Sequence, residues 1–283
     1  MAITFNSVES LSVVDQLGKN RQAVAKNLAR LSSGLRINSA ADDPAGLAIA
    51  QAMGAEVRSL SQAERSANDG VSMIQTADSA LDEVSGVLGR MRELAVQSAN
   101  GTLSGDARAA VDTEFQQLKA EIDRIANTTE FNGTTLLDQA TSLTFQVGID
   151  AGAAENTITV STADVNVAAI GQDGGGADSI ASAGVATVDQ ATTAIGSIDR
   201  AISEISSARA QLGSGVNRLN STIDFLATQR ENLSAAMSRI RDADVAEETA
   251  NRTRNMILVQ GSVALLAQAN VLPSVGLLLL GGK

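Results

Sequence analysis

The chain contains no cysteine, histidine, tryptophan or tyrosine. Without cysteine and histidine it has no disulfide, no thiolate nucleophile and no imidazole base, which excludes most hydrolase and zinc-site chemistries. Asp, Glu, Lys, Arg, Ser and Thr remain for catalysis, and no acid pair among them has neighbours that suggest a catalytic cleft. We therefore expect neither an enzyme nor a bound cofactor or metal.

Positive charge is also scarce, since 21 Lys and Arg stand against 32 Asp and Glu and give a net charge of −11. A nucleic-acid-binding protein usually presents a basic face, so this class is not expected. The first residues show no basic start followed by an apolar run, which argues against a cleavable signal peptide. The longest apolar run, around residues 277–280, is too short to span a bilayer, so we expect no membrane insertion.

Aromatic residues make up 2% of the chain, whereas hydrophobic residues make up 44%. This apolar content is mostly Ala, Leu, Ile and Val, which suits helices that pack closely along their length. The only prolines are Pro44 and Pro273, so long helices are allowed almost everywhere.

The strongest pattern is a stripe of apolar residues in alternating three- and four-residue steps from 195 to 240, interrupted by Arg209 and Arg230. It predicts a coiled-coil helix roughly 80 Å long at about 1.5 Å per residue. Residues 60–95 and 111–125 carry similar stripes, separated by turn residues at 100–105. Because one stripe cannot be buried against itself, the three segments predict a three-helix bundle.

Two further stripes, one near each end of the chain, match in length and period and are predicted to pair. The candidate packing residues of this pair are Val14, Leu17, Val24, Leu28, Leu31 and Leu35 in the first helix and Met256, Val259, Val263 and Leu266 in the second.

Shorter signals mark the ends of these helices. The acids before Pro44 predict a helix start at that proline, and the acids at 242–248 predict a junction between two helices. Alternating apolar and polar residues from 141 to 162 predict a β-hairpin. Gly174, Gly175 and Gly176 predict a flexible loop.

The fold class predicted from these patterns is mainly α, with long antiparallel coiled-coil helices forming a bundle and a small β-hairpin. We expect a terminal coiled-coil domain of residues 1–45 and 245–283, and a helical bundle of residues 46–140 and 176–244. Residues 141–175 are expected to supply the hairpin and loop of the bundle domain.

Several long motifs resemble bacterial flagellin. Residues 28–50, which read LARLSSGLRINSAADDPAGLAIA, resemble its N-terminal signature, and residues 90–101 and 130–137 are similar to its following blocks. Residues 241–249 and 265–270 resemble the C-terminal signature. The resemblance covers roughly residues 1–140 and 180–275, whereas the apolar sequence after Asn270 departs from the family.

The resemblance implies a structural subunit that polymerises with copies of itself into the extracellular filament of the bacterial flagellum for motility. Family members are exported unfolded by the flagellar type III apparatus and added beneath a cap. The implied partners are flagellar cap and hook-junction proteins, and a flagellin secretion chaperone bound to residues 245–280. Arg90, Leu94 and Glu114 match a segment that contacts neighbouring protofilaments or a host Toll-like receptor.

Two alternatives remain open at this stage. A hook–filament junction protein resembles flagellin at both ends but forms a single ring. A soluble coiled-coil adaptor would give a discrete oligomer and no fibres.

Overall fold

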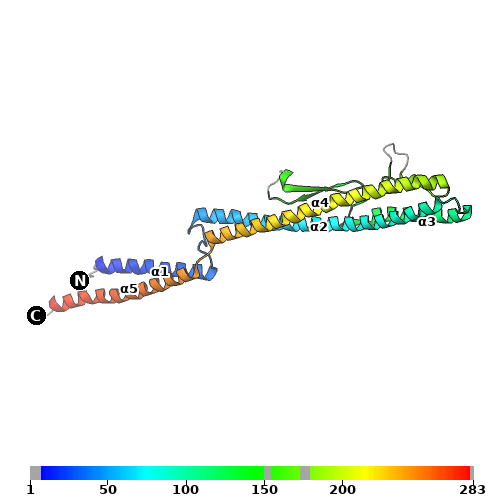
Figure 1. The fold of residues 1–283 in the computed structure, drawn as a ribbon. Coiled ribbons are helices and arrows are strands. Elements are labelled where there is room, and N and C mark those ends of the chain that lie inside the picture. The colour runs from blue at the N-terminus through cyan, green and yellow to red at the C-terminus, as the bar shows by residue number, and fades with distance from the viewer. Residues whose placement is uncertain (1–7, 150–153, 173–178, 281–283) are drawn as a thin grey trace. The chain divides into compact units, whose positions relative to one another are not determined.

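The computed structural model describes residues 8–149, 154–172 and 179–280 (Figure 1). Side chains are described in the last helix up to residue 269 and at 271, so the burial of the apolar end at 277–280 lies outside the described part. The helices are α1 (Val8–Ser33), α2 (Pro44–Ser98), α3 (Gly105–Thr128), α4 (Val188–Arg241) and α5 (Val245–Leu280), with short 3-10 helices at Ala154–Asn156 and Ile180–Ser182.

The chain divides into two compact units. The terminal unit comprises residues 1–57 and 231–283, and the central unit comprises residues 58–230. The breaks after α1 and after α4 fall at residues 34–43 and 242–244, away from the unit boundaries, so α2 and α4 each contribute to both units.

Acidic side chains begin two of the helices, as the sequence predicted. Asp43 Oδ1 accepts a hydrogen bond from the Gly46 N–H at 2.9 Å, and Pro44 occupies the first position of α2. Asp244 Oδ1 accepts from the N–H groups of Ala246 and Glu247 at 2.8 and 3.2 Å and caps α5. A carboxylate at this position satisfies free N–H groups and complements the positive end of the helix dipole.

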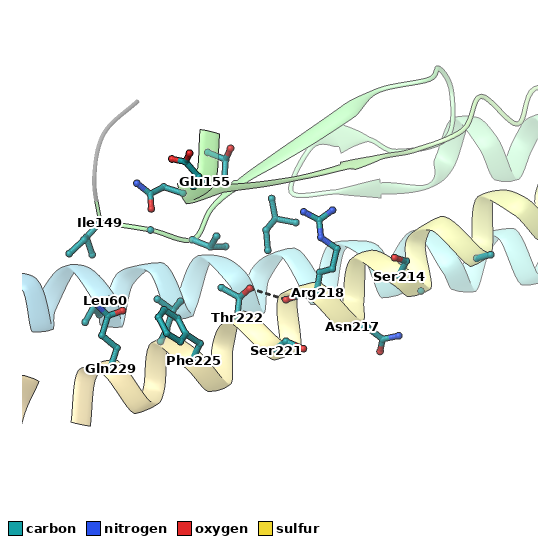
Figure 2. Close-up of a pocket in the computed structure, with 18 residues that line it drawn as sticks. Leu60, Ile149, Glu155, Ser214, Asn217, Arg218, Ser221, Thr222, Phe225 and Gln229 are labelled. Atoms are coloured by element: carbon teal, nitrogen blue, oxygen red, sulfur yellow. Dashed lines mark hydrogen bonds between the residues drawn. The ribbon is translucent and has the colours of Figure 1, made fainter. Parts of the chain in front are cut away.

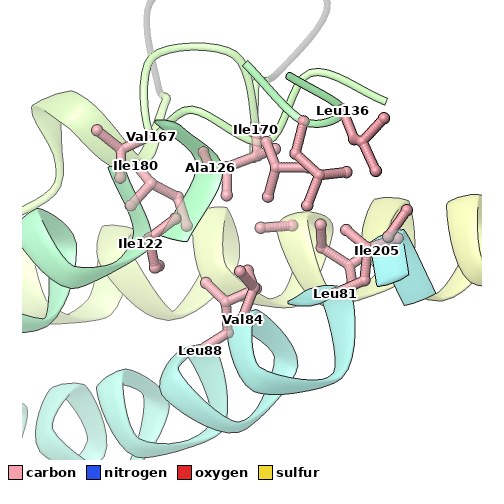
Figure 3. Close-up of a cluster of buried hydrophobic side chains, with 14 of the residues drawn as sticks. Leu81, Val84, Leu88, Ile122, Ala126, Leu136, Val167, Ile170, Ile180 and Ile205 are labelled. Atoms are coloured by element: carbon pink, nitrogen blue, oxygen red, sulfur yellow. The ribbon is translucent and has the colours of Figure 1, made fainter. Parts of the chain in front are cut away.

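The core of the central unit lies between α2, α3 and α4, which confirms the predicted three-helix bundle. Figure 3 shows Leu81, Val84 and Leu88 of α2 facing the side chains of α3, α4 and the segments that follow α3. The stripe predicted on α2 is buried throughout: Leu60, Ala63, Ala67, Ile74, Ala77, Leu81, Val84, Leu88, Met91 and Ala95. On α4, alternate stripe positions are fully buried, for example Ile198, Ile205, Leu212 and Leu219.

A β-hairpin packs on this bundle, as predicted. Strands β3 (Ser142–Gln146) and β4 (Thr157–Ser161) pair antiparallel with Phe145 opposite Ile158. The alternation in the sequence continues to Ile149, but β3 ends earlier because the N–H groups of Val147 and Gly148 both donate to the Asn156 carbonyl, at 2.8 and 3.0 Å. The glycine loop predicted at 174–176 lies outside the described residues.

A second, smaller hairpin was not predicted. Strands β1 (Glu130–Phe131) and β2 (Thr134–Thr135) pair across Asn132 and Gly133, whose φ angles are 51° and 77°. Asn-Gly is the usual sequence of a two-residue turn with two positive φ angles, so the signal was present in the sequence.

Candidate interaction surface of the terminal helices

Helices α1 and α5 lie side by side in the terminal unit (Figure 1), which confirms that the two end stripes pair. Asn27 contacts both Glu248 and Asn255, whereas Asn20 contacts Ser262. Because residue numbers fall along α1 as they rise along α5, the pair is antiparallel.

The structure separates the predicted packing residues into two groups. Leu17 is buried, and Val24, Leu31, Leu35, Val259 and Leu266 are half-buried. Val14, Leu28, Met256 and Val263 are exposed, and Leu28 is 52% accessible. The helical members of the first group are covered within the pair, and the second group leaves apolar surface open on its outside. The prediction that Leu35 belongs to the first helix is wrong, because α1 ends at Ser33 and Leu35 forms a backbone bridge with Asp242.

The exposed group belongs to a larger set, which we call the outer apolar surface. It consists of Leu11, Val14 and Leu28 on α1 and Val245, Met256, Ile257, Leu258, Val263, Leu265 and Val271 on α5. On α1, its members recur at the spacing of one helix face, next to the face that contacts α5. An apolar surface of this extent on a paired helix indicates a contact with another protein chain.

The contact face between α1 and α5 contains polar residues that the sequence reasoning missed. Glu248 is 6% exposed and Asn27 is 8% exposed. Glu248 Oε2 accepts from Asn27 Nδ2 at 2.5 Å, and Oε1 accepts from Arg30 Nη1 at 2.8 Å. Burial disfavours the charged carboxylate, but the hydrogen bonds from Asn27 and Arg30 and the positive charges of Arg30 and Lys26 outweigh it, so the pKa of Glu248 is lowered.

Two backbone hydrogen bonds join the segment that follows α1 to the end of α4 and the segment that follows it. The Arg36 N–H donates to the Arg241 carbonyl at 2.7 Å, and the Ala243 N–H donates to the Gly34 carbonyl at 2.9 Å. Gly34 has a φ of 71°, which a residue with a side chain adopts only with strain. These two hydrogen bonds hold the end of α1 beside the start of α5.

Asp42 links the same region to α1 through an ion pair with Lys26 at 2.7 Å. The hydrogen bond from Lys26 and those from the backbone N–H groups of Asn38 and Ser39 lower the pKa of Asp42 to about 2. The carboxylate is therefore charged at all but strongly acidic pH.

The predicted protofilament or receptor contact residues Arg90, Leu94 and Glu114 lie on the central unit. Arg90 Nη2 and Nε contact Glu114 Oε1 at 2.8 and 3.0 Å, and Arg90 Nη1 contacts Glu93 Oε2 at 2.9 Å. Both Arg90 and Glu114 are close to half exposed. Leu94 is 1% exposed and belongs to the core, so its side chain supports this surface from beneath.

An open groove of about 1210 Å³ runs between the end of the β3–β4 hairpin and α4 (Figure 2). Ile149 and Glu155 border it on the hairpin side, and Arg218, Thr222 and Phe225 border it on α4. Thr222 Oγ1 is already engaged by the Arg218 carbonyl, to which it donates at 2.9 Å. The lining mixes charged, hydroxyl, amide and apolar groups.

Two negative findings apply to the described residues alone. Within them, no group of three or more Asp or Glu side chains is placed to hold a metal ion. Across the same part of the chain, no helix combines the length and the hydropathy needed to cross a membrane.

Comparisons with known proteins agree with this arrangement. Residues 6–142 match the bacterial flagellin N-terminal helical region, and residues 195–280 match the bacterial flagellin C-terminal helical region. A flagellin of Halalkalibacterium halodurans is 44% identical over 276 residues, covering 97% of this chain and 98% of its own length. The flagellar filament 33 kDa core protein of Treponema phagedenis is 42% identical over 270 residues, covering 90% of this chain and 91% of its own.

Among solved structures, the crystal structure of Bacillus cereus flagellin is similar at 32% identity and a TM-score of 0.46, covering 61% of this chain and 94% of that one. Matches to both helical regions, together with full-length relatives at this identity, establish that the chain belongs to the bacterial flagellin family.

Proposed function

We propose that this chain is a structural subunit of the bacterial flagellar filament and that the outer apolar surface forms the contacts between copies. The observation that carries the proposal is the exposure of Leu28, Met256 and their neighbours on a helix pair that is already formed. Fully burying a wholly exposed side chain of this kind is worth about 1.5–3 kcal/mol. These side chains are about half exposed, so each contributes roughly half of that, and many contacts together drive assembly.

The geometry suits a polymer better than a closed oligomer of two. Exposed apolar residues occur on α1 and on α5 between Val245 and Val271, so one copy offers surface to several neighbours. Contacts between different patches on successive copies generate an open helical filament when the rotation from one copy to the next does not lead back to the first copy and form a ring. A structural role of this kind needs no catalytic group.

The finer steps are proposed by analogy with the bacterial flagellin family. We propose that the chain leaves the cell through the flagellar type III apparatus, is bound by a secretion chaperone along α5, and adds beneath a cap to a filament that begins at hook-junction proteins. The exposed apolar side chains of α5 support the chaperone contact. We also propose the surface around Arg90 and Glu114, supported by Leu94, as a protofilament contact and as the contact for a host Toll-like receptor.

Seeded growth tests the main proposal. The purified chain is mixed with short filament fragments and viewed by electron microscopy, beside the variants Leu28→Asp and Met256→Asp. Ser12→Asp is the matched control, because Ser12 is exposed on α1 and lies on a different helix face from Leu11, Val14 and Leu28. We expect long tubes of uniform diameter from the wild type and the control, and none from the two variants.

Circular dichroism verifies that each variant keeps its helical content. Growth of both apolar variants at the rate of the control would show that the outer apolar surface is not the contact between copies. A wild-type chain that gives only small discrete oligomers would contradict the proposal and favour a junction protein or an adaptor.

A further inference from the structure

The contact between α1 and α5 contains a line of polar side chains where an ordinary helix pair would be apolar. Asn20 and Asn27 are buried on α1, and Glu248 and Ser262 are buried on α5. We call this line, completed at its edge by Arg30 and Asn255, the polar ladder: Asn20, Asn27, Arg30, Glu248, Asn255 and Ser262.

Each member of the polar ladder finds a complementary group on the other helix. Asn27 donates to Glu248 and accepts from Asn255 Nδ2 at 2.9 Å. Asn20 Nδ2 donates to Ser262 Oγ at 3.4 Å, and the Ser262 hydroxyl in turn donates a hydrogen bond to the Leu258 carbonyl at 2.7 Å. The contacts repeat along the pair, so sliding one helix past the other breaks them together.

The two sides of the ladder differ in charge. The contact face of α1, at Val13, Leu17, Asn20, Val24, Asn27 and Leu31, carries no carboxylate, whereas Glu248 supplies one on α5. If two copies of α1 paired in parallel, their Arg30 side chains would lie together, and two parallel copies of α5 would place two buried Glu248 carboxylates together. The antiparallel pair also sets basic Arg30, in the last turn of α1, beside acidic Glu248, in the first turn of α5, which suits both helix dipoles.

Such a network contributes little net stability. A buried ion pair loses hydration that its attraction only partly restores. Arg30 Nε is also buried without a hydrogen-bond partner among the described groups. Buried polar residues in helix pairs more often determine register and partner choice than strength.

We propose that the polar ladder selects α5 as the partner of α1 and fixes one antiparallel register, while the outer apolar surface supplies the driving force for assembly. Apolar contacts are non-directional, and α1 and α5 offer similar stripes at similar spacing. In a filament that holds many copies of both helices, the ladder prevents slipped or mismatched pairs. This last consequence rests on the proposed function, whereas the specification of register does not.

A competing explanation is that the hydrogen bonds at Arg36–Arg241 and Ala243–Gly34 alone fix the register by holding the helix ends together. The experiment therefore removes the ladder and leaves those contacts in place. The double variant Asn27→Leu, Glu248→Leu replaces both buried polar partners. Gln22→Leu, Glu247→Leu is the matched control, since it makes the same kinds of change at exposed positions of the same helices.

The absence of natural cysteine allows register to be read by disulfide formation. Val24 lies between Asn20 and Asn27 on α1, and Val259 lies between Asn255 and Ser262 on α5, so Val24→Cys with Val259→Cys reports the observed register. Val24→Cys with Leu266→Cys reports a register slipped by one heptad, because a disulfide needs closely spaced Cβ atoms. Each cysteine pair is placed in the wild-type, ladder and control chains and oxidised in free subunits and in seeded filaments.

We expect the observed-register disulfide to exceed the slipped one by about tenfold or more in the wild-type and control chains, and this ratio to fall towards one in the ladder variant. Because this variant leaves Arg30 without its carboxylate partner, its helical signal should melt earlier than that of the wild type, so the ratio is compared at a temperature well below both transitions. If Leu at both positions disrupts folding, Glu248→Gln, which keeps the shape and removes the charge, should give an intermediate ratio.

An unchanged ratio in the ladder variant would overturn the proposal and assign register to the backbone contacts at 34–36 and 241–243. A ratio near one in the wild type would overturn it as well. If the chain forms no filaments but the ratio in free subunits falls as expected, the proposed function fails and the inference about register stands.

Discussion

Arg209 of α4 lies with its Nε 2.9 Å from Oδ1 of Asp78 on α2, and its Nη1 lies 2.6 Å from Oδ1 of Asp82. The arginines that interrupt the apolar stripe of α4 are therefore links between helices. Arg230 makes the same kind of contact, with Glu64 of α2 at 3.0 Å.

These links should contribute less to stability than the apolar positions beside them. The Arg209 side chain is 35% exposed, so water and salt screen its ion pairs. We expect Arg209→Ala to lower the free energy of unfolding by less than about 1 kcal/mol. Leu212→Ala, at a position 1% exposed, should lower it by about 2–5 kcal/mol.

Denaturant titration followed by circular dichroism measures both changes, and repeating it in high salt should shrink the arginine effect further. A larger loss for Arg209→Ala than for Leu212→Ala would show that charge, rather than apolar packing, holds α2 and α4 together.

Gly70 of α2 should determine how closely the β3–β4 hairpin approaches the bundle. A Cβ atom at this position would lie 2.9 Å from Cδ1 of Phe145 in β3. We expect Gly70→Ala to destabilise the central unit by about 1–3 kcal/mol, because the ring must move out of a packed site. Thermal unfolding measures the change.

Gly86 offers a matched control on the same helix. A Cβ atom there would meet nothing within 4 Å, so Gly86→Ala should raise stability by roughly 0.5–1 kcal/mol through helix propensity alone. Equal effects of the two substitutions would mean that the hairpin does not press on Gly70.

The long helices and the main hairpin could be predicted because their signals are periodic and local. The stripe at 60–95 has a single buried face, which packs against the rest of the central unit, so the spacing of apolar residues alone identifies the core positions. The turn at Asn132–Gly133 is equally local, because an Asn-Gly pair indicates it, but β1 and β2 are only two residues long and carry no alternation that would mark them as strands.

The contact face of α1 could not be identified in the same way. Val14, Leu17, Val24, Leu28 and Leu31 all fit one period of three and four. Which of them face α5 depends on a helix more than 200 residues away in the sequence, and on buried asparagines that an apolar pattern overlooks. The structure turns Leu17, Val24 and Leu31 inward and Val14 and Leu28 outward.

Lys119 of α3 holds the chain segment that precedes α4. Its Nζ donates to the carbonyls of Ala181 and Ala183 at 2.6 and 2.9 Å, and burial lowers its pKa despite the nearby charges of Asp112 and Asp123. Lys119→Met would leave two carbonyls without this donor. We expect a loss of about 1–3 kcal/mol in unfolding free energy and faster amide exchange near residues 181–185.

Lys26→Met serves as the comparison, since Lys26 is an exposed lysine whose partner, Asp42, lies in the terminal unit. It should leave exchange near 181–185 unchanged. If Lys119→Met also leaves that exchange unchanged, the lysine does not hold the segment.

Acid should loosen the terminal unit through Asp42 and Glu248. Both carboxyl groups have a pKa below the ordinary value, that of Asp42 at about 2, because Lys26 and the backbone stabilise one charge and Asn27 and Arg30 the other. A lowered pKa in the folded state contributes stability above the unfolded pKa, and this stability is lost as pH falls through the folded pKa. Between about pH 4.5 and pH 2, we therefore expect the contacts of α1 with α5 and with residues 38–42 to weaken.

Amide hydrogen exchange, measured from neutral pH to about pH 2 and corrected for the intrinsic rate, should show earlier loss of protection in α1 and α5 than in the core of α2 and α4. The double variant Asp42→Asn, Glu248→Gln should lose protection at neutral pH and respond less to acid, because neither group can titrate. Asp15→Asn, which removes an exposed carboxylate of α1, serves as the control and should follow the wild type. An acid response in the double variant as large as that of the wild type would place the responsible groups elsewhere in the chain.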